Sequence, residues 1–447
     1  MAAHGLAWIP YQPLLLGLLL IQQTAASLPE DAVTNLREYL RIKTVHPQPD
    51  YEAAKEFLVA YGKNLTLEVD VMEFVSGDPV ILMTWKGSNP EASSILLNSH
   101  MDVVPVEQVK WRHDAFEAVR EPSGDIVGRG SQDMKCVGIQ YLEAIRKLQA
   151  KVFKPVRSVH VLFVPDEEIG GHDGMERFIA SEKFSDIQVG VALDEGLASP
   201  TADYRVFYGE RTLWWLSIKA VGAPGHGSKL FDGSAAENLL KSLALISAYR
   251  EEEFNAYKSG EAAEAEVTSI NLSFLKAGTP SPSGFVMNLQ PSEAEAGFDI
   301  RIPPSADAED LERRIREEWA PVERNMTYEF LQKNVYRSVS AEPLVTPFDV
   351  SNPWWAVFAT AVEKTGVKLS KPEIFPAATD GRYLRYKDFP VIGFSPMRET
   401  PVLLHDHNEF LNEGVFLEGV DAYESIIAAL STFDGADGPS YALREEL

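Results

Sequence analysis

Two almost uninterrupted apolar runs place the strongest limit on the fold of this chain. Residues 159–164 read Val-His-Val-Leu-Phe-Val, and residues 189–193 read Val-Gly-Val-Ala-Leu. Strands this apolar are covered on both faces, which is typical of parallel sheets with helices on either side. Helix-like and strand-like patterns alternate around them between residue 28 and about residue 200. The pattern predicts an α/β fold with a mixed sheet whose centre is largely parallel.

The elements around these runs follow from the spacing of their apolar residues. Helical periodicity appears at residues 32–42, 53–65 and 134–148, and strand-like runs appear at residues 67–74, 80–85 and 95–98. Near the end of the chain, helices are expected at residues 353–365, 380–386 and 415–433, with a strand at residues 391–394. This late segment again offers one strand with helices, so we expect it to complete the first sheet.

Between residues 211 and 333 the order of the patterns changes. Strand 213–220, helix 235–257, strands 267–275 and 293–302, helix 307–319 and strand 327–332 follow one another. This β-α-β-β-α-β order is that of a ferredoxin-like α+β unit. We therefore predict one discontinuous domain, residues 28–210 and 334–447, with residues 211–333 inserted as a second domain.

Size and charge agree with two soluble domains and exclude some functions. The chain has 447 residues, of which 45% are hydrophobic and 24% charged, and its formal net charge is −25. An acidic surface repels nucleic-acid phosphates and anionic lipid, so binding to either through bulk charge is not expected.

Residues 1–27 contain no Lys, Arg, Asp or Glu, and residues 14–21 form a leucine-rich core followed by small residues. That core is shorter than the about 20 residues that cross a bilayer, so the segment reads as a cleavable signal peptide. We expect a protein that is secreted or lumenal in the secretory pathway, without a membrane span after cleavage. Sequons at Asn64, Asn271 and Asn325 are compatible with this route, and their glycosylation stays open.

Cys136 is the single cysteine, so no internal disulfide can form. It lies inside a helical apolar pattern, which predicts a buried structural thiol rather than a nucleophile.

Acidic and histidine residues recur directly after the apolar runs. The carboxyl ends of neighbouring strands meet at one edge of an α/β sheet, so residues there can converge from distant parts of the chain. Two imidazoles with several carboxylates suit two Zn²⁺-like cations that share a bridging carboxylate. The residues in question are His100, Asp102, Asp133, Glu167, Glu168, Asp194, Glu195, His405 and His407.

Each of these residues also has a plain structural interpretation. Asp133 could cap the helix that follows it, Glu167 and Glu168 could form a solvated surface pair, and His405 with His407 could lie in an ordinary polar loop. Spacing alone does not decide between the two interpretations.

Five motifs, in this order along the chain, resemble those of peptidase family M20, whose members are co-catalytic zinc peptidases and amidohydrolases. They are His-Met-Asp-Val-Val-Pro at 100–105, Gly-Arg-Gly-Ser-Gln-Asp-Met-Lys at 128–135, Asp-Glu-Glu-Ile-Gly-Gly at 166–171, Leu-Asp-Glu-Gly at 193–196 and Leu-His-Asp-His at 404–407. Within the family the chain resembles the aminoacylases, and the resemblance covers almost all of the mature chain. It implies a zinc-dependent enzyme that hydrolyses N-acyl-L-amino acids.

The resemblance implies a role for each residue. His100 and Glu195 would bind one Zn²⁺, Glu168 and His405 the other, and Asp133 would bridge the two ions. Asp102 would orient His100, and Glu167 would act as general base on the water between the ions. On the residues alone, Asp194 could replace Glu195 as a ligand and His407 could replace His405; the family pattern favours Glu195 and His405.

In the inserted domain, Gly-Ala-Pro-Gly-His-Gly-Ser at 222–228 resembles a loop whose histidine reaches the active site of a partner subunit in dimeric relatives. The resemblance thus implies a homodimer, with His226 completing the partner's site and the inserted domain acting as a dimerisation or lid domain. Asn288 and Arg301 match positions that recognise the substrate carboxylate, although a strand salt bridge is an alternative for Arg301.

Other functions are weighed against this one. A dipeptidase or carboxypeptidase could use the same zinc centre, and a catalytically inactive extracellular metal-binding protein could keep the same fold. Glu167 argues against the inactive protein, because metal binding alone does not need a general base. Gly227 and Leu-Gln-Pro at 289–291 depart from the family pattern, which leaves the acyl and side-chain preference open. Motifs of serine hydrolases, zincins and P-loop proteins are absent from the sequence.

Overall fold

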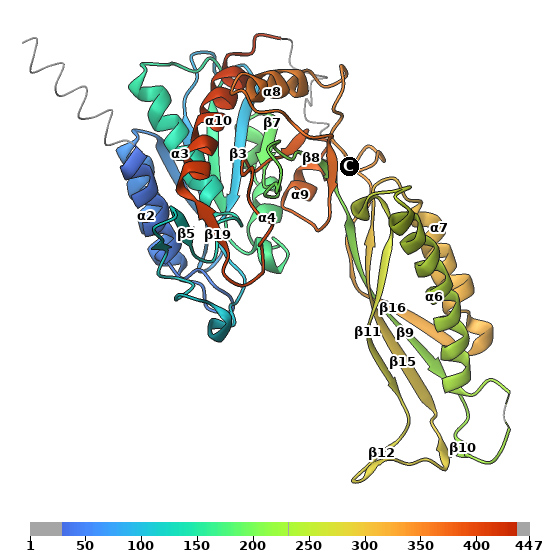
Figure 1. The fold of residues 1–447 in the computed structure, drawn as a ribbon. Helices are drawn as coiled ribbons and strands as arrows, with labels where there is room; N and C mark the ends of the chain where they lie inside the picture. Colours follow the sequence, from blue (N-terminus) through green and yellow to red (C-terminus); the bar gives the residue numbers. More distant parts are fainter. Residues whose placement is uncertain (1–28, 231, 436–447) are drawn as a thin grey trace, which may run out of the picture.

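The structure is a computed structural model that describes residues 29–230 and 232–435. The predicted signal peptide, residues 1–27, lies outside the described residues. The chain forms two bodies, one built around a large sheet and one elongated body that extends away from it (Figure 1). Within the described residues, no helix is both long and apolar enough to cross a membrane.

The first body contains an eight-stranded mixed sheet in the order β1-β2-β6-β3-β7-β18-β8-β17. Strands β6, β3, β7 and β18 run parallel to one another at its centre, as the apolar runs predict. The outer strands β1 and β2 are antiparallel. The strands are β1 Glu68–Val75, β2 Asp78–Trp85, β3 Ser94–His100, β6 Val159–Val164, β7 Val189–Asp194, β8 Phe207–Glu210, β17 Glu373–Phe375 and β18 Val391–Gly393.

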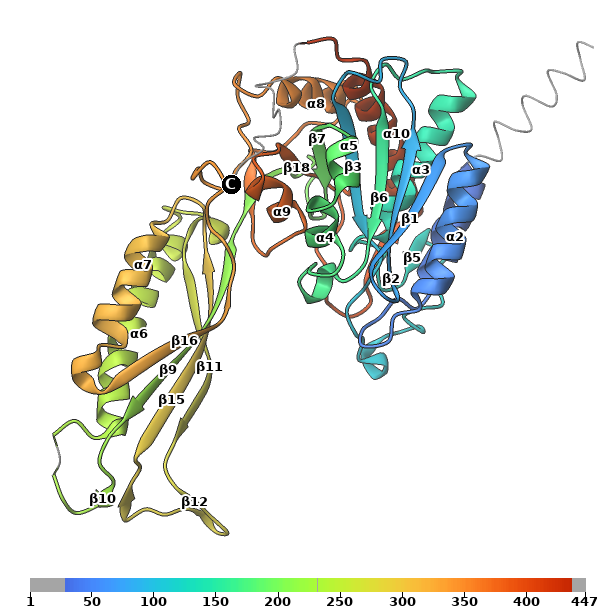
Figure 2. The same ribbon diagram turned by 180° about the vertical axis from the view of Figure 1, so that it is seen from behind.

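Helices cover both faces of this sheet, so each central strand sends alternate residues into two cores. In β6, Val161 and Phe163 pack into one core, and Leu162 and Val164 pack into the other. Figure 1 shows the helices of the first face, and Figure 2 shows those of the second. The first face carries a helix over residues 29–41 with α2 Tyr51–Asn64, α3 Lys135–Ala150, α8 Pro353–Glu363 and α10 Glu413–Thr432; the second carries α4 Met175–Ile179, α5 Glu182–Asp186 and α9 Gly381–Tyr386.

The second body follows the predicted β-α-β-β-α-β order. Its antiparallel sheet has the strand order β11-β15-β9-β16, and α6 and α7 cover one face (Figure 1). Trp214, Phe298 and Trp319 belong to its core, which is separate from the cores of the first body. The elements are β9 Thr212–Val221, α6 Ala235–Ser259, β11 Ser269–Ala277, β15 Glu293–Ile302, α7 Ala308–Arg314 continued by a π-helical turn Ile315–Trp319, and β16 Met326–Lys333.

Several short strands complete the fold, and the sequence patterns did not predict them. Strands β4 Val119–Arg120, β5 Asp125–Val127 and β19 Phe410–Asn412 form a small sheet that joins the middle of the chain to its end. Two ribbons lie at the far end of the second body, β10 Gly225–His226 with β14 Leu289–Gln290, and β12 Pro280–Ser281 with β13 Gly284–Phe285. Such strands are too short to show an alternating pattern.

Cys136 lies in α3 and is fully buried, so the prediction of a buried thiol is confirmed. Burial raises the pKa of this thiol well above its ordinary value. The side chain therefore stays protonated and unreactive at neutral pH.

Candidate metal centre

The predicted site residues converge at the carboxyl ends of three adjacent parallel strands. His100 is the last residue of β3, Glu167 and Glu168 lie in a short turn directly after β6, and Glu195 follows β7. Asp133 comes from the loop before α3. The fifth ligand candidate, His405, lies on the loop between β18 and β19, far away in sequence.

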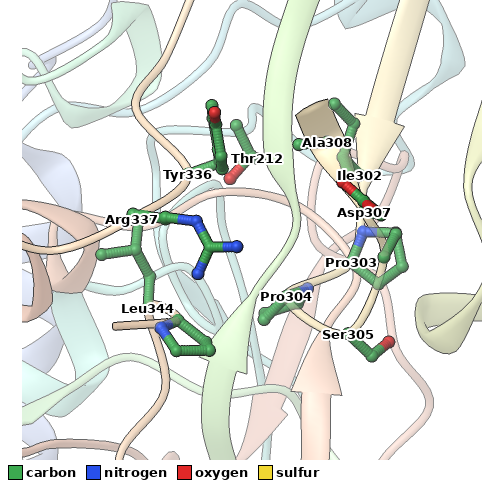
Figure 3. Close-up of a pocket in the computed structure, with 12 residues that line it drawn as sticks. Thr212, Ile302, Pro303, Pro304, Ser305, Asp307, Ala308, Tyr336, Arg337 and Leu344 are labelled. Carbon is green, nitrogen blue, oxygen red and sulfur yellow. The ribbon is translucent and has the colours of Figure 1, made fainter. Parts of the chain in front are cut away.

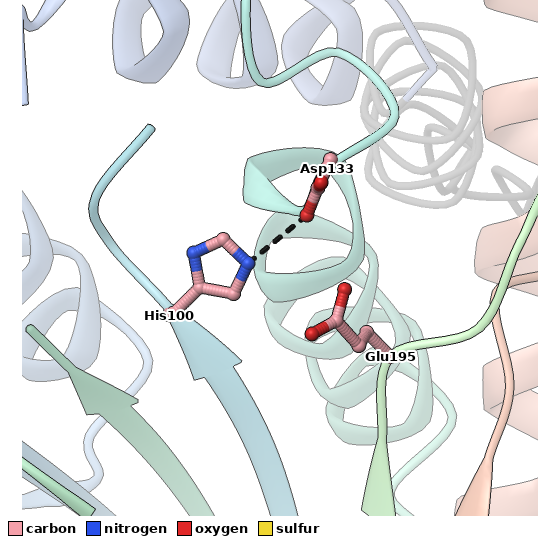
Figure 4. A group of neighbouring side chains, drawn as sticks. All are labelled: His100, Asp133 and Glu195. Carbon is pink, nitrogen blue, oxygen red and sulfur yellow. Dashed lines mark hydrogen bonds and ion pairs between the residues drawn. The ribbon is translucent and has the colours of Figure 1, made fainter. Parts of the chain in front are cut away.

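His100, Asp133 and Glu195 form one compact group of donor atoms (Figure 4). Their ligand atoms all lie within 4.8 Å of one another, and all three residues are buried. His100 Nε2 is 3.0 Å from Asp133 Oδ1. This arrangement is able to hold one cation.

Asp133, Glu168 and His405 form a second group within the same 4.8 Å limit. His405 Nε2 lies 3.3 Å from Asp133 Oδ2 and 2.9 Å from Glu168 Oε2. The two oxygens of Asp133 thus face different histidines. A carboxylate in this position can bridge two cations.

The geometry excludes two of the plain structural interpretations, the helix cap and the solvated surface pair. Asp133 does not cap α3: its N-cap is Met134, which makes no capping side-chain bond. The side chains of Glu167 and Glu168 are 9% and 5% exposed, so they are not a solvated pair.

The two alternative ligands point elsewhere. Asp194 Oδ1 accepts hydrogen bonds from Asn98 Nδ2 and from the backbone N–H of Glu195, at 3.0 and 2.9 Å. His407 Nε2 lies 3.9 Å from Glu107. Neither residue belongs to the two groups, so the geometry favours Glu195 and His405.

The donors fit divalent metal ions such as zinc, which is bound by imidazole nitrogen and carboxylate oxygen. Glu168 Oε1 is buried and has no hydrogen-bond partner among the described residues. A buried carboxylate oxygen without a partner is costly, and a cation would satisfy it. The residues present therefore suit the metal that the sequence implies.

Asp102 connects the histidine of the first group to the two glutamates. His100 Nδ1 lies 3.0 Å from the backbone oxygen of Asp102 and 3.4 Å from its carboxylate, which leaves Nε2 for the site. The same carboxylate accepts the backbone N–H groups of Glu167 and Glu168, at 3.1 and 3.0 Å. His46 Nε2 lies 3.0 Å from it as well. Burial opposes ionisation of Asp102, but hydrogen bonds with the two histidines outweigh burial and lower its pKa to about 2.

The crowded acids and histidines shift one another's pKa values. Burial, together with the charge of Asp133, raises the pKa of Glu168 to about 7. Hydrogen bonds with Asp133 and Glu168 raise the pKa of His405 to about 10. Burial also raises the pKa values of Glu167 and Glu195 well above their usual range. A cation bound through the imidazole of His405 competes with a proton for the same nitrogen.

Glu167 is not part of either ligand group, and the guanidinium group of Arg382 lies beside it. Its Oε1 is 3.6 Å from Arg382 Nη1. Arg382 is held by the backbone oxygen of Gly170, to which its Nη2 donates at 2.6 Å. The turn closes at Gly171, where φ is +64° and a Cβ atom would lie 2.4 Å from Asp380 Oδ1, so a larger residue does not fit there.

The predicted substrate residues all lie in the second body. His226 and Asn288 are exposed at its far end, where β10 pairs with β14 (Figure 1). Arg301 lies on β15 and makes two bonds to Asp299, at 2.8 and 3.1 Å. A single chain therefore keeps His226 and Asn288 away from the metal centre, whereas Arg301 pairs with Leu213 at the start of β9, near the first body.

A cavity of about 340 Å³ opens near the junction of the two bodies (Figure 3). It is lined by residues from the start of β9, the end of β15 and the following loop, with Tyr336 and Arg337 on another side. None of the candidate ligands lines it, although all of them are among the described residues. The candidate site is thus defined by its donor atoms and not by this cavity.

Sequence reasoning missed His46 and Arg382. His46 has no ligand-like spacing and reaches Asp102 only through folding. Arg382 ends the run Thr-Asp-Gly-Arg at 379–382, and an arginine two residues after an aspartate could have drawn attention to it.

Comparisons with known proteins identify the family of this chain. The family model described as Peptidase family M20/M25/M40 matches residues 96–429. Aminoacylase-1B of Rattus norvegicus is 46% identical over 410 residues, covering 92% of this chain and 97% of the relative. Aminoacylase-1 of Homo sapiens is 46% identical, covering 90% and 95%. A dinuclear metal binding peptidase of the M20 family from Bacillus subtilis has a TM-score of 0.63 at 14% identity, covering 91% of this chain and 100% of the other. This chain is a metallo-amidohydrolase and belongs to peptidase family M20/M25/M40.

Proposed function

We propose that this protein is a zinc-dependent aminoacylase that hydrolyses N-acyl-L-amino acids to a carboxylate and a free L-amino acid. The proposal rests on one observation: two compact ligand groups share Asp133 and lie beside Glu167, whose side chain is 9% exposed. The aminoacylase relatives support the substrate class, because their similarity extends over at least 90% of this chain.

The ligand groups support two Zn²⁺ ions per subunit, His100 and Glu195 holding one, Glu168 and His405 the other. Bound zinc would polarise the amide carbonyl and lower the pKa of a water molecule in the site.

Glu167 would take a proton from the attacking water and deliver it to the nitrogen of the leaving amino acid. Asp102 would keep His100 in its ligating tautomer and hold the turn that carries Glu167. Asn288 and Arg301 would bind the substrate carboxylate, for which guanidinium offers two parallel donors.

A substrate panel tests this function. We expect the purified protein to release methionine from N-acetyl-L-methionine. It should lose this activity after treatment with a chelator and regain it when Zn²⁺ is added. The panel also contains dipeptides and peptides with a free carboxyl terminus, since a dipeptidase or carboxypeptidase could use the same ions. Zinc-dependent cleavage of these substrates with none of any N-acyl amino acid would contradict the proposal. Zinc binding without turnover of any substrate would favour the inactive metal-binding protein instead.

We also propose a homodimer in which His226 of one copy completes the metal site of the other. His226 is exposed on β10, remote from the ligands of its own chain. In the same body, β11 is an edge strand on which Leu272 and Leu275 are 50% and 53% exposed. An exposed apolar edge strand is suited to pairing with another chain, and a symmetric pair would bury it twice. In the partner's site, the imidazole would stabilise the negative charge that develops on the attacked carbonyl oxygen.

Subunit mixing tests this arrangement. His226→Ala and Glu167→Gln should each be inactive alone, because each removes a different part of every site. After random exchange, half of the dimers are mixed and one of their two sites is intact, so about a quarter of the wild-type rate should return. No recovery, or a fully active monomer in light scattering, would contradict the role of His226 in the partner site.

The proposed location is secreted, or lumenal in the secretory pathway. It is supported by the uncharged residues 1–27 with their short leucine-rich core. Expression of the full chain in secreting cells should give a product in the medium whose amino terminus, read by protein sequencing, lies close to Leu28. Retention in the cytosol with Met1 intact would contradict it.

A further inference from the structure

Glu409 holds the backbone of the loop that carries Asp133. Its Oε1 accepts the N–H groups of Gln132 and Asp133, at 2.6 and 3.3 Å. Its Oε2 accepts the N–H of Gly130 at 3.2 Å and Arg129 Nη1 at 2.7 Å. Glu409 is fully buried, so these four bonds replace all of its contact with water.

Gln132 holds the opposite loop in return. Its Nε2 donates to the backbone oxygens of Pro401 and Phe410, at 3.1 and 2.8 Å. Its Oε1 accepts the N–H of Leu403 at 3.0 Å. Gln132 is 3% exposed. Each loop therefore contributes one buried side chain that binds the backbone of the other, and we name this pair, Gln132 and Glu409, the clasp.

The clasp joins the two loops that supply Asp133 and His405. Glu409 accepts the N–H of Asp133, and the backbone atoms that Gln132 binds lie on both sides of His405 in sequence, at Pro401 and Leu403 before it and at Phe410 after it. The antiparallel pairing of Phe410 with Val127 sits next to the clasp and fixes the register of the two loops. The separation of Asp133 from His405 thus depends on a small set of buried bonds.

The two metal groups differ in how much they need such support. His100 and Glu195 stand at the ends of neighbouring parallel strands, β3 and β7, and both residues are buried. The side chain of His405 is 52% exposed and lies on an irregular loop, where Asn408 adds an outer contact with the backbone of Arg112. Asp133 is shared by both groups, but the first also has two ligands at strand ends, so loss of the clasp should disturb the second group more than the first.

We propose that Glu409 and Gln132 are positioning residues that hold Asp133 and His405 at the separation needed to bind the second metal ion. This inference rests on the proposed two-metal function. It extends that function to two residues that touch neither substrate nor metal and act through the backbone of the loops.

Two substitutions test the clasp from opposite sides. In Glu409→Gln, either orientation of the amide turns an NH₂ group towards N–H donors, so at least two of the four bonds are lost. Gln132→Met keeps a side chain of similar length but removes three bonds. We expect each variant to bind one of its two Zn²⁺ ions about 10- to 100-fold more weakly, in competition with a chromophoric chelator, while the affinity for the other ion, which also uses Asp133, falls by a smaller factor.

A variant that binds a single ion shows which of the two ions is affected. His405→Ala should bind only the ion held by His100, Asp133 and Glu195, and adding Glu409→Gln to it should weaken that ion less than Glu409→Gln weakens the more sensitive ion in a chain that keeps His405. Glu143→Gln is the matched control, because Glu143 is also a buried carboxylate surrounded by donors, among them Asn35 and Arg146. We expect this control to lower the melting temperature without changing either zinc affinity.

The results separate the clasp from a simple structural role and from the proposed activity. The proposal would be overturned if Glu409→Gln and Gln132→Met left both zinc affinities unchanged. It would also be overturned if they lowered both affinities equally. A wild-type chain that binds no second ion would overturn it too. A wild-type chain that binds two ions but hydrolyses no N-acyl amino acid would refute the proposed activity, while the selective loss of one ion in the variants would still support the clasp.

Discussion

Glu167→Gln should lower kcat for N-acetyl-L-methionine by about 10²- to 10⁴-fold, the usual contribution of a general base. Glutamine has the same shape and fills the same buried space, but its amide cannot accept the proton of the attacking water. Glu167 belongs to neither ligand group, so the zinc content of the variant should equal that of the wild type. Steady-state kinetics combined with metal analysis of the same sample measures both quantities.

The control for this substitution is Glu143→Gln, which removes another buried carboxylate but lies outside the ligand groups. Its kcat should match that of the wild type at a temperature where both are folded. Wild-type turnover in Glu167→Gln would exclude the proposed base. A loss of zinc in that variant would instead make Glu167 a ligand.

Asp133→Asn should remove both ions, because both histidines face this one carboxylate, at 3.0 and 3.3 Å. An amide offers only one oxygen and no negative charge, so it cannot bridge two cations. Turnover should fall at least about 100-fold, since the loss of a residue that merely supports a ligand already costs 10- to 100-fold. Zinc content after dialysis and the rate with and without added Zn²⁺ measure the effect.

Two further pairs of variants decide the two ligand choices that the residues alone leave open. Glu195→Gln should lose one ion while Asp194→Asn keeps both, and His405→Ala should lose one while His407→Ala keeps both. The opposite result in either pair would make the other residue of that pair the metal ligand. A dialysed Asp133→Asn protein that still holds two ions would show that Asp133 does not bridge.

Much of the fold could be predicted from the sequence, because burial leaves a mark on local composition. The run at residues 159–164 is apolar at successive positions, and in the structure β6 packs into cores on both faces of the sheet. The inserted body follows the predicted order because each of its strands and helices is long enough to show a period. Short strands such as β5 and β19 show no such period and depend on their pairing with each other.

The candidate site was predictable to the extent that its residues recur in motifs after strands. That pattern identified the acids and histidines that the structure brings together. It could not identify His46 or Glu409, since their partners are Asp102 and the backbone of residues 130–133, and such contacts leave no spacing in the sequence. It also could not show that a single chain keeps His226 away from the ligands.

The sequence by itself therefore identified the candidate site residues and most of the elements in which they lie, because residue type and apolar period are local properties. The tertiary structure decided which atoms meet. It turned Asp133 from a possible helix cap towards two histidines, and it directed Asp194 and His407 to other partners. Those choices depend on distances between loops that are far apart in the chain, and such distances are fixed only when the sheet and its surrounding loops pack together.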